Sequence, residues 1–327
     1  MQRLRGLIPE LPSPAIGLGQ ALFTPSNPLK GICAAGLTSV LVACGGGGSP
    51  GSVTSPLTLS KPESYVLKWS DEFTTPGGLG SAWSYDLGAE LIPAPPEPGG
   101  TVWGNSERQF YTRDSANVFV RNGELTIQPV AGVPVGAPSR SPALLATSAR
   151  IKTDTSDYYA ALNGTPYGFY EIRAKVPCVA GAWPAIWMMG RNGVWPERGE
   201  IDIMEWFGRY FANDVNQVQS GVHTKNKWGA NSLYQKNKVT GMCTEYHKFQ
   251  MHWTASEILI GVNGVPTFSY KKPPGAGTAD WPFDQQAHLI LNVAVGGNLG
   301  GDNPQLSDLP LMTLKVDYVR VWQTPGR

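Results

Sequence analysis

Residues 199–206 read Gly-Glu-Ile-Asp-Ile-Met-Glu-Trp, so acidic side chains are threaded through apolar ones. On a β-strand, successive side chains point to opposite faces, which places Glu200 and Asp202 together on one face. Glu205 comes three residues after Asp202 and would face the core in a regular strand. Burying an unpaired carboxylate is costly, whereas one extra residue in a β-bulge returns Glu205 to the face of the other two acids. We therefore predict a strand with a bulge at Ile203-Met204.

A row of carboxyl groups on one face suits proton-transfer chemistry, because a neighbouring acid can raise the pKa of a carboxyl group. Retaining glycoside hydrolysis needs one ionised carboxylate as nucleophile and one protonated acid as donor. On a straight strand the Cα atoms of Glu200 and Glu205 would lie ~13 Å apart. Retaining carboxyl groups lie about 5–5.5 Å apart, so the strand would have to curve concavely. A solvated acidic face or a calcium-binding edge would explain the same segment, and both stay open at this point.

The composition favours an uncharged partner. The 327 residues include 11 Trp, 12 Tyr and 10 Phe, and only 16% are charged. This aromatic content excludes a chain that is disordered throughout, and the formal net charge of +1 argues against nucleic acid as a partner. Aromatic rings stack on the apolar faces of sugars without ionic help. The 4 Cys and 4 His show no metal-binding spacing, and no phosphate-binding loop follows a strand. We therefore expect a polysaccharide partner and no catalytic cofactor.

Short alternating segments separated by turn residues dominate the chain after its first sixty residues. Asn122-Gly123 and Asn263-Gly264 each join two such segments, and Asn-Gly is a strong signal for a two-residue hairpin. Residues 314–322 also alternate, and no segment keeps a helical period over three turns. These features predict an all-β sandwich or jelly roll, formed as a single domain by residues 63–327.

The segment before that domain resembles an export signal. The apolar run 31–43 is too short to cross a bilayer, which needs about 20 apolar residues, but it has the length of a signal-peptide core. The sequence Leu-Val-Ala-Cys that ends at Cys44 resembles a bacterial lipobox. We therefore expect a leader over residues 1–44, lipidation of Cys44, and a flexible tether over residues 45–62. A buried helix followed by a linker is the alternative.

These features predict an exported protein, held at the cell envelope or outer membrane by its lipid or else secreted. The membrane would be reached only through the lipid anchor, and we expect a monomer. Export would leave Cys178 and Cys243 in an oxidising compartment, where they can form one disulfide. Their spacing does not establish the bond, because a disulfide requires Cα atoms within about 7 Å.

Together, these motifs resemble glycoside hydrolase family 16, specifically its bacterial laminarinase-like members, which are endo-β-1,3-glucanases. The family signature Glu-x-Asp-x-x-Glu is matched by Glu200, Asp202 and Glu205, and the likeness extends over nearly all of residues 65–323. The other segments that match lie at residues 69–73, 103–112, 148–151, 181–188, 222–224, 281–284, 291–297 and 316–321.

The resemblance implies a β-jelly roll of two stacked, curved antiparallel sheets, of the concanavalin A-like type, with an open concave cleft for polysaccharide. It implies that Glu200 is the nucleophile, Glu205 the general acid/base, and Asp202 the residue that orients and tunes them. It also implies a set of sugar-binding residues, with core packing or structural pairing as the alternative for several of them. These are Trp103, Trp183 and Trp187, by stacking, and Asn105, Arg150 and His223, by hydrogen bonds.

Many family members carry one structural calcium ion away from the catalytic face. The resemblance places it at Glu72, near the first strand, and at Asp317, on the last. Backbone carbonyls and water would complete the ligand set. Catalysis itself would need no cofactor.

The expected activity is hydrolysis of internal β-1,3 linkages in laminarin-like glucan with retention of configuration. The same mechanism acting on mixed-linkage β-1,3-1,4-glucan, or on a galactan such as agar, is the first alternative. A non-catalytic glucan-binding protein is the second, although all three acids of the signature are present. Transglycosylation stays open, because the sequence does not encode which acceptor enters in the second step.

Overall fold

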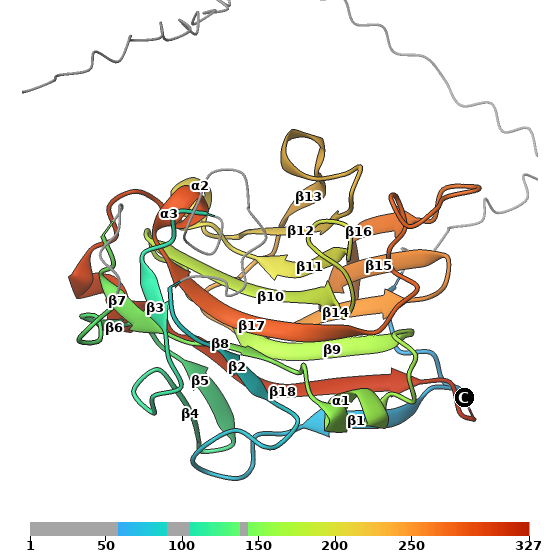
Figure 1. The fold of residues 1–327 in the computed structure, drawn as a ribbon, viewed down its shortest axis with the longest axis horizontal. Helices are drawn as coiled ribbons and strands as arrows, with labels where there is room; N and C mark the ends of the chain where they lie inside the picture. Colours follow the sequence, from blue (N-terminus) through green and yellow to red (C-terminus); the bar gives the residue numbers. More distant parts are fainter. Residues whose placement is uncertain (1–57, 90–104, 138–142, 327) are drawn as a thin grey trace, which may run out of the picture. The chain divides into compact units, whose positions relative to one another are not determined.

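The structure, a computed structural model, describes residues 58–89, 105–137 and 143–326. Within these residues two curved antiparallel sheets are stacked on each other (Figure 1). The first sheet has the strand order β16 (Val265–Lys271), β15 (Glu257–Val262), β14 (His247–Trp253), β9 (Gly168–Lys175), β18 (Leu314–Gln323), β5 (Glu124–Ile127) and β4 (Val118–Arg121), and β1 (Val66–Asp71) pairs with β18.

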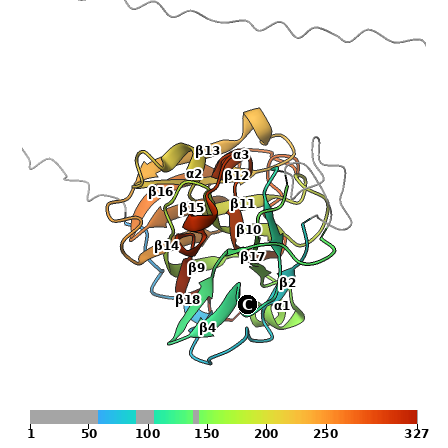
Figure 2. The ribbon, with the colours of Figure 1, turned by 90° about the vertical axis from the view of Figure 1, so that its left-hand side faces the viewer.

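The second sheet carries the acidic strand. Its strand order is β13 (Leu233–Lys238), β12 (Gln217–His223), β11 (Glu200–Glu205), β10 (Ala182–Gly190), β17 (Ala287–Val295), β8 (Arg150–Lys152) and β2 (Ser84–Asp86). Figure 2 shows β10, β11 and β12 in one layer and β9, β14 and β15 in the other. A small third sheet consists of β3 (Gln109–Tyr111), β7 (Ala146–Ser148) and β6 (Val130–Ala131).

Helices are few and short in the part of the chain that the structure describes. They are α1 (Ser156–Ala161), α2 (Gly208–Phe211), α3 (Gly297–Gly300) and the 3-10 turns Gly229–Asn231 and Leu306–Leu311. In these residues no helix has the length and apolar character needed to span a membrane. The expectation of an all-β sandwich of two antiparallel sheets is therefore confirmed.

Both expected hairpins form, and their turn residues have the backbone conformation that this turn type requires. Asn122 and Gly123 have φ of 56° and 74° and join β4 to β5, while Asn263 and Gly264 have φ of 52° and 84° and join β15 to β16. Positive φ at both central residues defines a type I′ turn, in which Asn and Gly are least strained.

The hydrophobic core lies between the two sheets and is filled by the alternate side chains of their strands. Every residue of β17 is buried. Trp206, Trp253 and Trp281 are among the largest fully buried side chains of the core. Because one face of the second sheet supplies this core, the opposite face of that sheet is left for polar side chains. We call this opposite face the carboxylate face.

The ordered domain begins earlier than residue 63. Leu59 is buried, and its N–H donates to the carbonyl oxygen of Gly264 at 2.7 Å. The end of the tether that we expected over residues 45–62 is therefore part of the folded domain. The expected leader, Cys44 and the rest of the tether lie outside the described residues.

Candidate active site

The bulge in β11 brings the three acids to the carboxylate face. In the pairing of β11 with β12, Asp202 lies opposite Gly221 and Glu205 lies opposite Gln219, so three steps on β11 match two on β12. On its other side β11 skips Ile203 in the pairing with β10, and the Ile203 side chain is fully buried. The predicted bulge is confirmed. It places an apolar residue in the core and keeps Glu205 beside the other two carboxyl groups.

His223 supplies the positive charge next to these acids. Its Nε2 atom lies 3.3 Å from Oδ2 of Asp202, which is only 2% exposed. Side-chain atoms of Glu200, Asp202 and His223 all lie within 4.8 Å of one another. On the far side of the ring, Nδ1 of His223 is 3.3 Å from the hydroxyl of Ser232. The expected site residue His223 therefore contacts an acid of the signature directly.

Each glutamate accepts a hydrogen bond from an indole. Trp183 Nε1 donates to Oε1 of Glu205 at 3.1 Å, and Trp195 Nε1 donates to Oε2 of Glu200 at 2.6 Å. Such bonds favour the ionised carboxylate and fix the direction in which the side chain points. Trp183, which we expected to stack on sugar, is largely buried and orients Glu205.

The surroundings of Glu200, Glu205 and His223 raise the pKa of each of these side chains. Burial, followed by the charge of Asp202, raises the pKa of Glu200 to about 8. The same two causes, burial and the charge of Asp202, raise the pKa of Glu205 well above its usual range. Burial alone would lower the pKa of His223, but its hydrogen bond with Asp202 and the charges of the surrounding acids raise that pKa to about 10. Both glutamates therefore keep their protons to higher pH than an exposed carboxyl group does.

Glu200, Asp202 and His223 are also residue types that bind metals. A metal-binding histidine must be neutral, however, and the surroundings of His223 favour its protonated form. The arrangement fits acid–base chemistry, in which His223 offsets the charge of Asp202.

Trp187 lies directly opposite Asp202 on the neighbouring strand β10, and Arg150 packs against its ring. The guanidinium carbon of Arg150 is 4.6 Å from the centre of the Trp187 ring, and its Nε is 2.9 Å from Oδ2 of Asp86. Trp187 Nε1 donates to Oδ1 of Asn292 at 2.8 Å. The indole is therefore held at its N–H edge by Asn292 and on one face by Arg150. Arg150 therefore positions Trp187, and the partly buried Trp187 keeps some surface for a ligand.

The remaining two expected residues are Asn105 and Trp103. The backbone oxygen of Asn105 accepts a hydrogen bond from the N–H of Asn298 at 2.8 Å. Trp103 lies outside the described residues.

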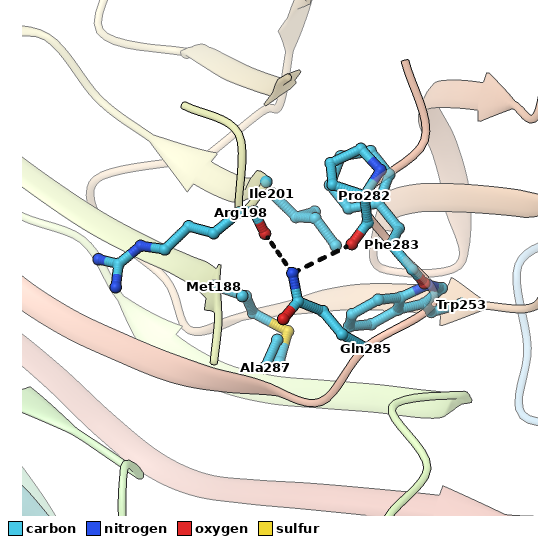
Figure 3. A pocket seen from close by; sticks show the side chains of 10 residues that line it. Met188, Arg198, Ile201, Trp253, Pro282, Phe283, Gln285 and Ala287 are labelled. Carbon is cyan, nitrogen blue, oxygen red and sulfur yellow. Dashed lines mark hydrogen bonds between the residues drawn. The ribbon is translucent and has the colours of Figure 1, made fainter. Parts of the chain in front are cut away.

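Gln285 holds the turn that leads into β11 through two hydrogen bonds (Figure 3). Gln285 Nε2 donates to the carbonyl oxygens of Arg198 and Pro282, at 3.0 and 3.5 Å. Gly199 follows with φ of 79°, and a Cβ atom there would lie 2.7 Å from Cγ of Pro282. Only glycine fits this position without strain, so the residue directly before Glu200 is dictated by backbone packing.

Comparison with known proteins agrees with this geometry. The sequence profile of the glycosyl hydrolases family 16 matches residues 107–320. The chain belongs to this family. A beta-glucanase from Rhodothermus marinus is 36% identical over 304 residues, which cover 88% of this chain and 93% of that protein. The glucan endo-1,3-beta-glucosidase A1 of Niallia circulans is 33% identical over 270 residues, which cover 79% of this chain but only 38% of that longer protein.

A solved structure of the same family shows a sugar in place. It is a mutant of SCLam, a non-specific endo-β-1,3(4)-glucanase, with 1,3-β-D-cellobiosyl-glucose at its active site. It is 32% identical to this chain, with a TM-score of 0.68, and the match covers 81% of this chain and 97% of SCLam.

The calcium site expected from the family pattern has other contacts in this structure. Nε and Nη2 of Arg320 lie 3.0 and 2.8 Å from the two carboxylate oxygens of Glu72. Asp317 is paired with Arg173. As placed, these two carboxylates do not fit a calcium site, because each already has a guanidinium partner. Calcium binding by this family 16 chain stays a prediction that these contacts do not support.

Cys178 and Cys243 form a disulfide in the structure, with their Cα atoms 5.5 Å apart. The bond ties the loop that leads into β10 to the turn before β14. Both cysteines are partly buried and pack against the hydrophobic core.

Two contributors to the site were not identified from the sequence. Trp195 precedes the signature in an irregular loop, and only the fold brings its N–H to Glu200. Asn292 holds Trp187 through Oδ1 and donates from Nδ2 to the hydroxyl of Tyr111 at 3.2 Å. The available signal in the sequence was the position of both residues near recognised motifs. Trp195 lies shortly before the signature, and Asn292 lies in a segment that matches the family 16 pattern.

Proposed function

We propose that this chain is a retaining endo-glycoside hydrolase that cleaves internal β-1,3 linkages of laminarin-like β-glucan. The observation that carries the proposal is the bulged strand, with Glu200, Asp202 and Glu205 on one face and a separate indole donor for each glutamate. The names of the family 16 relatives, a beta-glucanase and a glucan endo-1,3-beta-glucosidase, support this substrate class.

In the first step, a carboxylate oxygen of Glu200 attacks the anomeric carbon while Glu205 donates its proton to the glycosidic oxygen. The bond from the anomeric carbon to that oxygen breaks, and a glycosyl ester on Glu200 forms. The raised pKa of Glu205 keeps its proton available, and the Trp195 N–H favours the ionised form of Glu200.

In the second step, Glu205 takes a proton from water, whose oxygen attacks the same carbon and releases Glu200 as a carboxylate. Asp202, paired with His223, stays between the two glutamates in both steps. Its charge raises the pKa of each glutamate, and the positive charge of His223 limits that effect.

Mixed-linkage β-1,3-1,4-glucan is the second candidate substrate. The family 16 structure with bound sugar is of a non-specific endo-β-1,3(4)-glucanase, and its ligand is 1,3-β-D-cellobiosyl-glucose. A related family 16 protein is therefore described as acting on both linkages, and the mechanism proposed here would be unchanged.

The test measures reducing ends and product sizes on laminarin, barley β-glucan and agarose side by side. We expect short oligosaccharides chiefly from laminarin, with the polymer shortened before glucose accumulates. Glu200→Gln and Glu205→Gln should each lower turnover by at least about 100-fold while the melting temperature stays near that of the unmodified protein. Activity that survives either substitution would contradict the assigned roles, and glucose as the sole early product would contradict endo action.

We also propose an extracytoplasmic location, supported by the apolar run 31–43 and by the lipobox-like sequence at Cys44. Mass spectrometry of the protein from its native membrane fraction tests this. A diacylglyceryl-modified peptide that begins at Cys44 is expected, and an unmodified, uncleaved N-terminus would contradict it.

A further inference from the structure

The edge strand β13 adds side chains to the carboxylate face next to the acids. Tyr234 on β13 lies opposite Gly221 on β12, which in turn lies opposite Asp202. These three residues therefore form one row across the sheet. The opposite side of β13 faces the other sheet, because Asn237 Nδ2 donates to the carbonyl oxygen of Thr267 on β16 at 2.9 Å. Tyr234, which differs from Asn237 by an odd number of residues, consequently points to the carboxylate face.

Gly221 lies between Asp202 and Tyr234, and its backbone packs too closely against β13 for a side chain to fit. A Cβ atom at Gly221 would lie 2.8 Å from the carbonyl oxygen of Leu233 and 3.1 Å from Cβ of Tyr234. With no side chain at this position, the row has an acid at one end, a bare backbone in the middle and an aromatic ring at the other end.

Lys236 lies in the next row and is surrounded by aromatic rings. It is opposite Gln219, which is opposite Glu205. Its ammonium nitrogen is 5.7 Å from the ring centre of Tyr210, 5.6 Å from Phe211 and 5.8 Å from Tyr234. These distances lie near the outer limit of a cation–π contact, so the ammonium keeps hydrogen-bonding capacity.

Two of these rings are available to a ligand. Tyr210 is 57% exposed and Tyr234 is 53% exposed, whereas Phe211 is buried. Tyr210 belongs to α2, which follows β11 directly, so the strip formed by Tyr210, Tyr234 and Lys236 combines this helix with the edge strand β13. Exposed tyrosines beside a lysine offer apolar faces for sugar rings and donors for sugar hydroxyl groups.

We propose that Tyr210, Tyr234 and Lys236 form a distal subsite that binds the glucan chain beyond the sugars held at the acids. The inference rests on the proposed function. The occupant is the same polysaccharide, because the strip is continuous with Asp202 and Glu205 through the strand pairing and carries neutral aromatic surface around one cation. The proposed subsite predicts that long glucan chains bind the protein more tightly through these contacts and that glucan chains too short to reach β13 do not.

The experiment compares KM and kcat for laminarin and for laminaritriose, using the full-length protein and the variant Tyr210→Ala/Tyr234→Ala. Loss of two stacking rings should raise KM for laminarin about three- to tenfold and leave both constants for laminaritriose unchanged. Lys236→Ala should have a smaller effect in the same direction. The matched control is Tyr246→Ala. The ring centre of Tyr246 lies 4.8 Å from the guanidinium carbon of Arg173, a residue of the other sheet.

The result that would overturn the subsite is an unchanged KM for laminarin, or an equal rise for laminarin and laminaritriose. An equal change in the Tyr246→Ala control would also overturn it. Failure of the proposed function is distinguishable, because the unmodified protein would then release no products from laminarin. Binding to laminarin embedded in a native gel, measured with the Tyr substitutions placed on Glu200→Gln, gives a second readout. If the subsite binds laminarin, the Tyr substitutions should decrease the retardation of the protein by laminarin in the gel.

Discussion

Removing the indole N–H that contacts Glu200, the proposed nucleophile, should change the pH dependence of the reaction. Trp195 Nε1 lies 2.6 Å from Oε2 of Glu200. A hydrogen bond to a charged group contributes about 1.5–3 kcal/mol, whereas one to a neutral group contributes about 0.5–1.5 kcal/mol. The difference favours the ionised form by about 1.4 kcal/mol, which corresponds to about one pKa unit. Trp195→Phe should therefore raise the pKa of Glu200 above its present value of about 8 by that amount.

Several charges act on Glu200 besides this bond. Asp202 and Glu205 share its strand, His223 faces it from β12, and Arg198 contributes from the preceding turn. The substitution leaves all of them in place. Because Glu200 must be ionised to attack, activity is lost as the pH falls through its pKa. A higher pKa moves that acidic limb to higher pH.

The assay is the pH profile of kcat/KM on laminarin, measured for Trp195→Phe and for the control Trp228→Phe. Trp228 packs edge-on against Trp195 with ring centres 5.5 Å apart, so the control removes a neighbouring indole of the same cluster. We expect the acidic limb to move up by about one unit for Trp195→Phe only, with about tenfold lower activity below the limb. A uniform loss at every pH with an unmoved limb, or equal shifts in both variants, would refute the reasoning and leave Trp195 a packing residue.

Two further predictions concern stability, measured by thermal unfolding. Gly199→Ala should destabilise the protein by about 2–3 kcal/mol, because strain at positive φ adds to a clash with Pro282. Gly123→Ala, which has φ of 74° and no atom near its Cβ, should cost only about 1–2 kcal/mol, and equal effects would contradict the role assigned to the clash. Cys178→Ser/Cys243→Ser opens a link between residues 65 apart and should cost about 4 kcal/mol, or about 10 °C in Tm. An unchanged Tm in this variant, or in the original protein after reduction, would show that the bond is not needed.

Much of the catalytic strand could be predicted from local sequence. Strand parity, together with the cost of burying a carboxylate, required a bulge at Ile203-Met204, and the strand pairing contains it. Both Asn-Gly pairs form the expected hairpins. These features depend on residues only a few positions apart, which is why alternation and turn chemistry are enough to predict them.

The tuning of the acids could not be predicted in the same way. Trp183 and Arg150 were expected to contact sugar, but one orients Glu205 and the other supports Trp187. The carboxylates expected at a calcium site are paired with arginines.

The sequence by itself determined the strand pattern, the turns, and the face on which Glu200, Asp202 and Glu205 lie, because these follow from the period of the backbone. Only the tertiary structure decided which groups share their protons and hydrogen bonds. His223 reaches Asp202 through strand pairing, and Trp195 reaches Glu200 through the fold of an irregular loop. The pKa values follow from burial and from charges at a few ångströms, which are properties of the packed molecule and not of spacing along the chain.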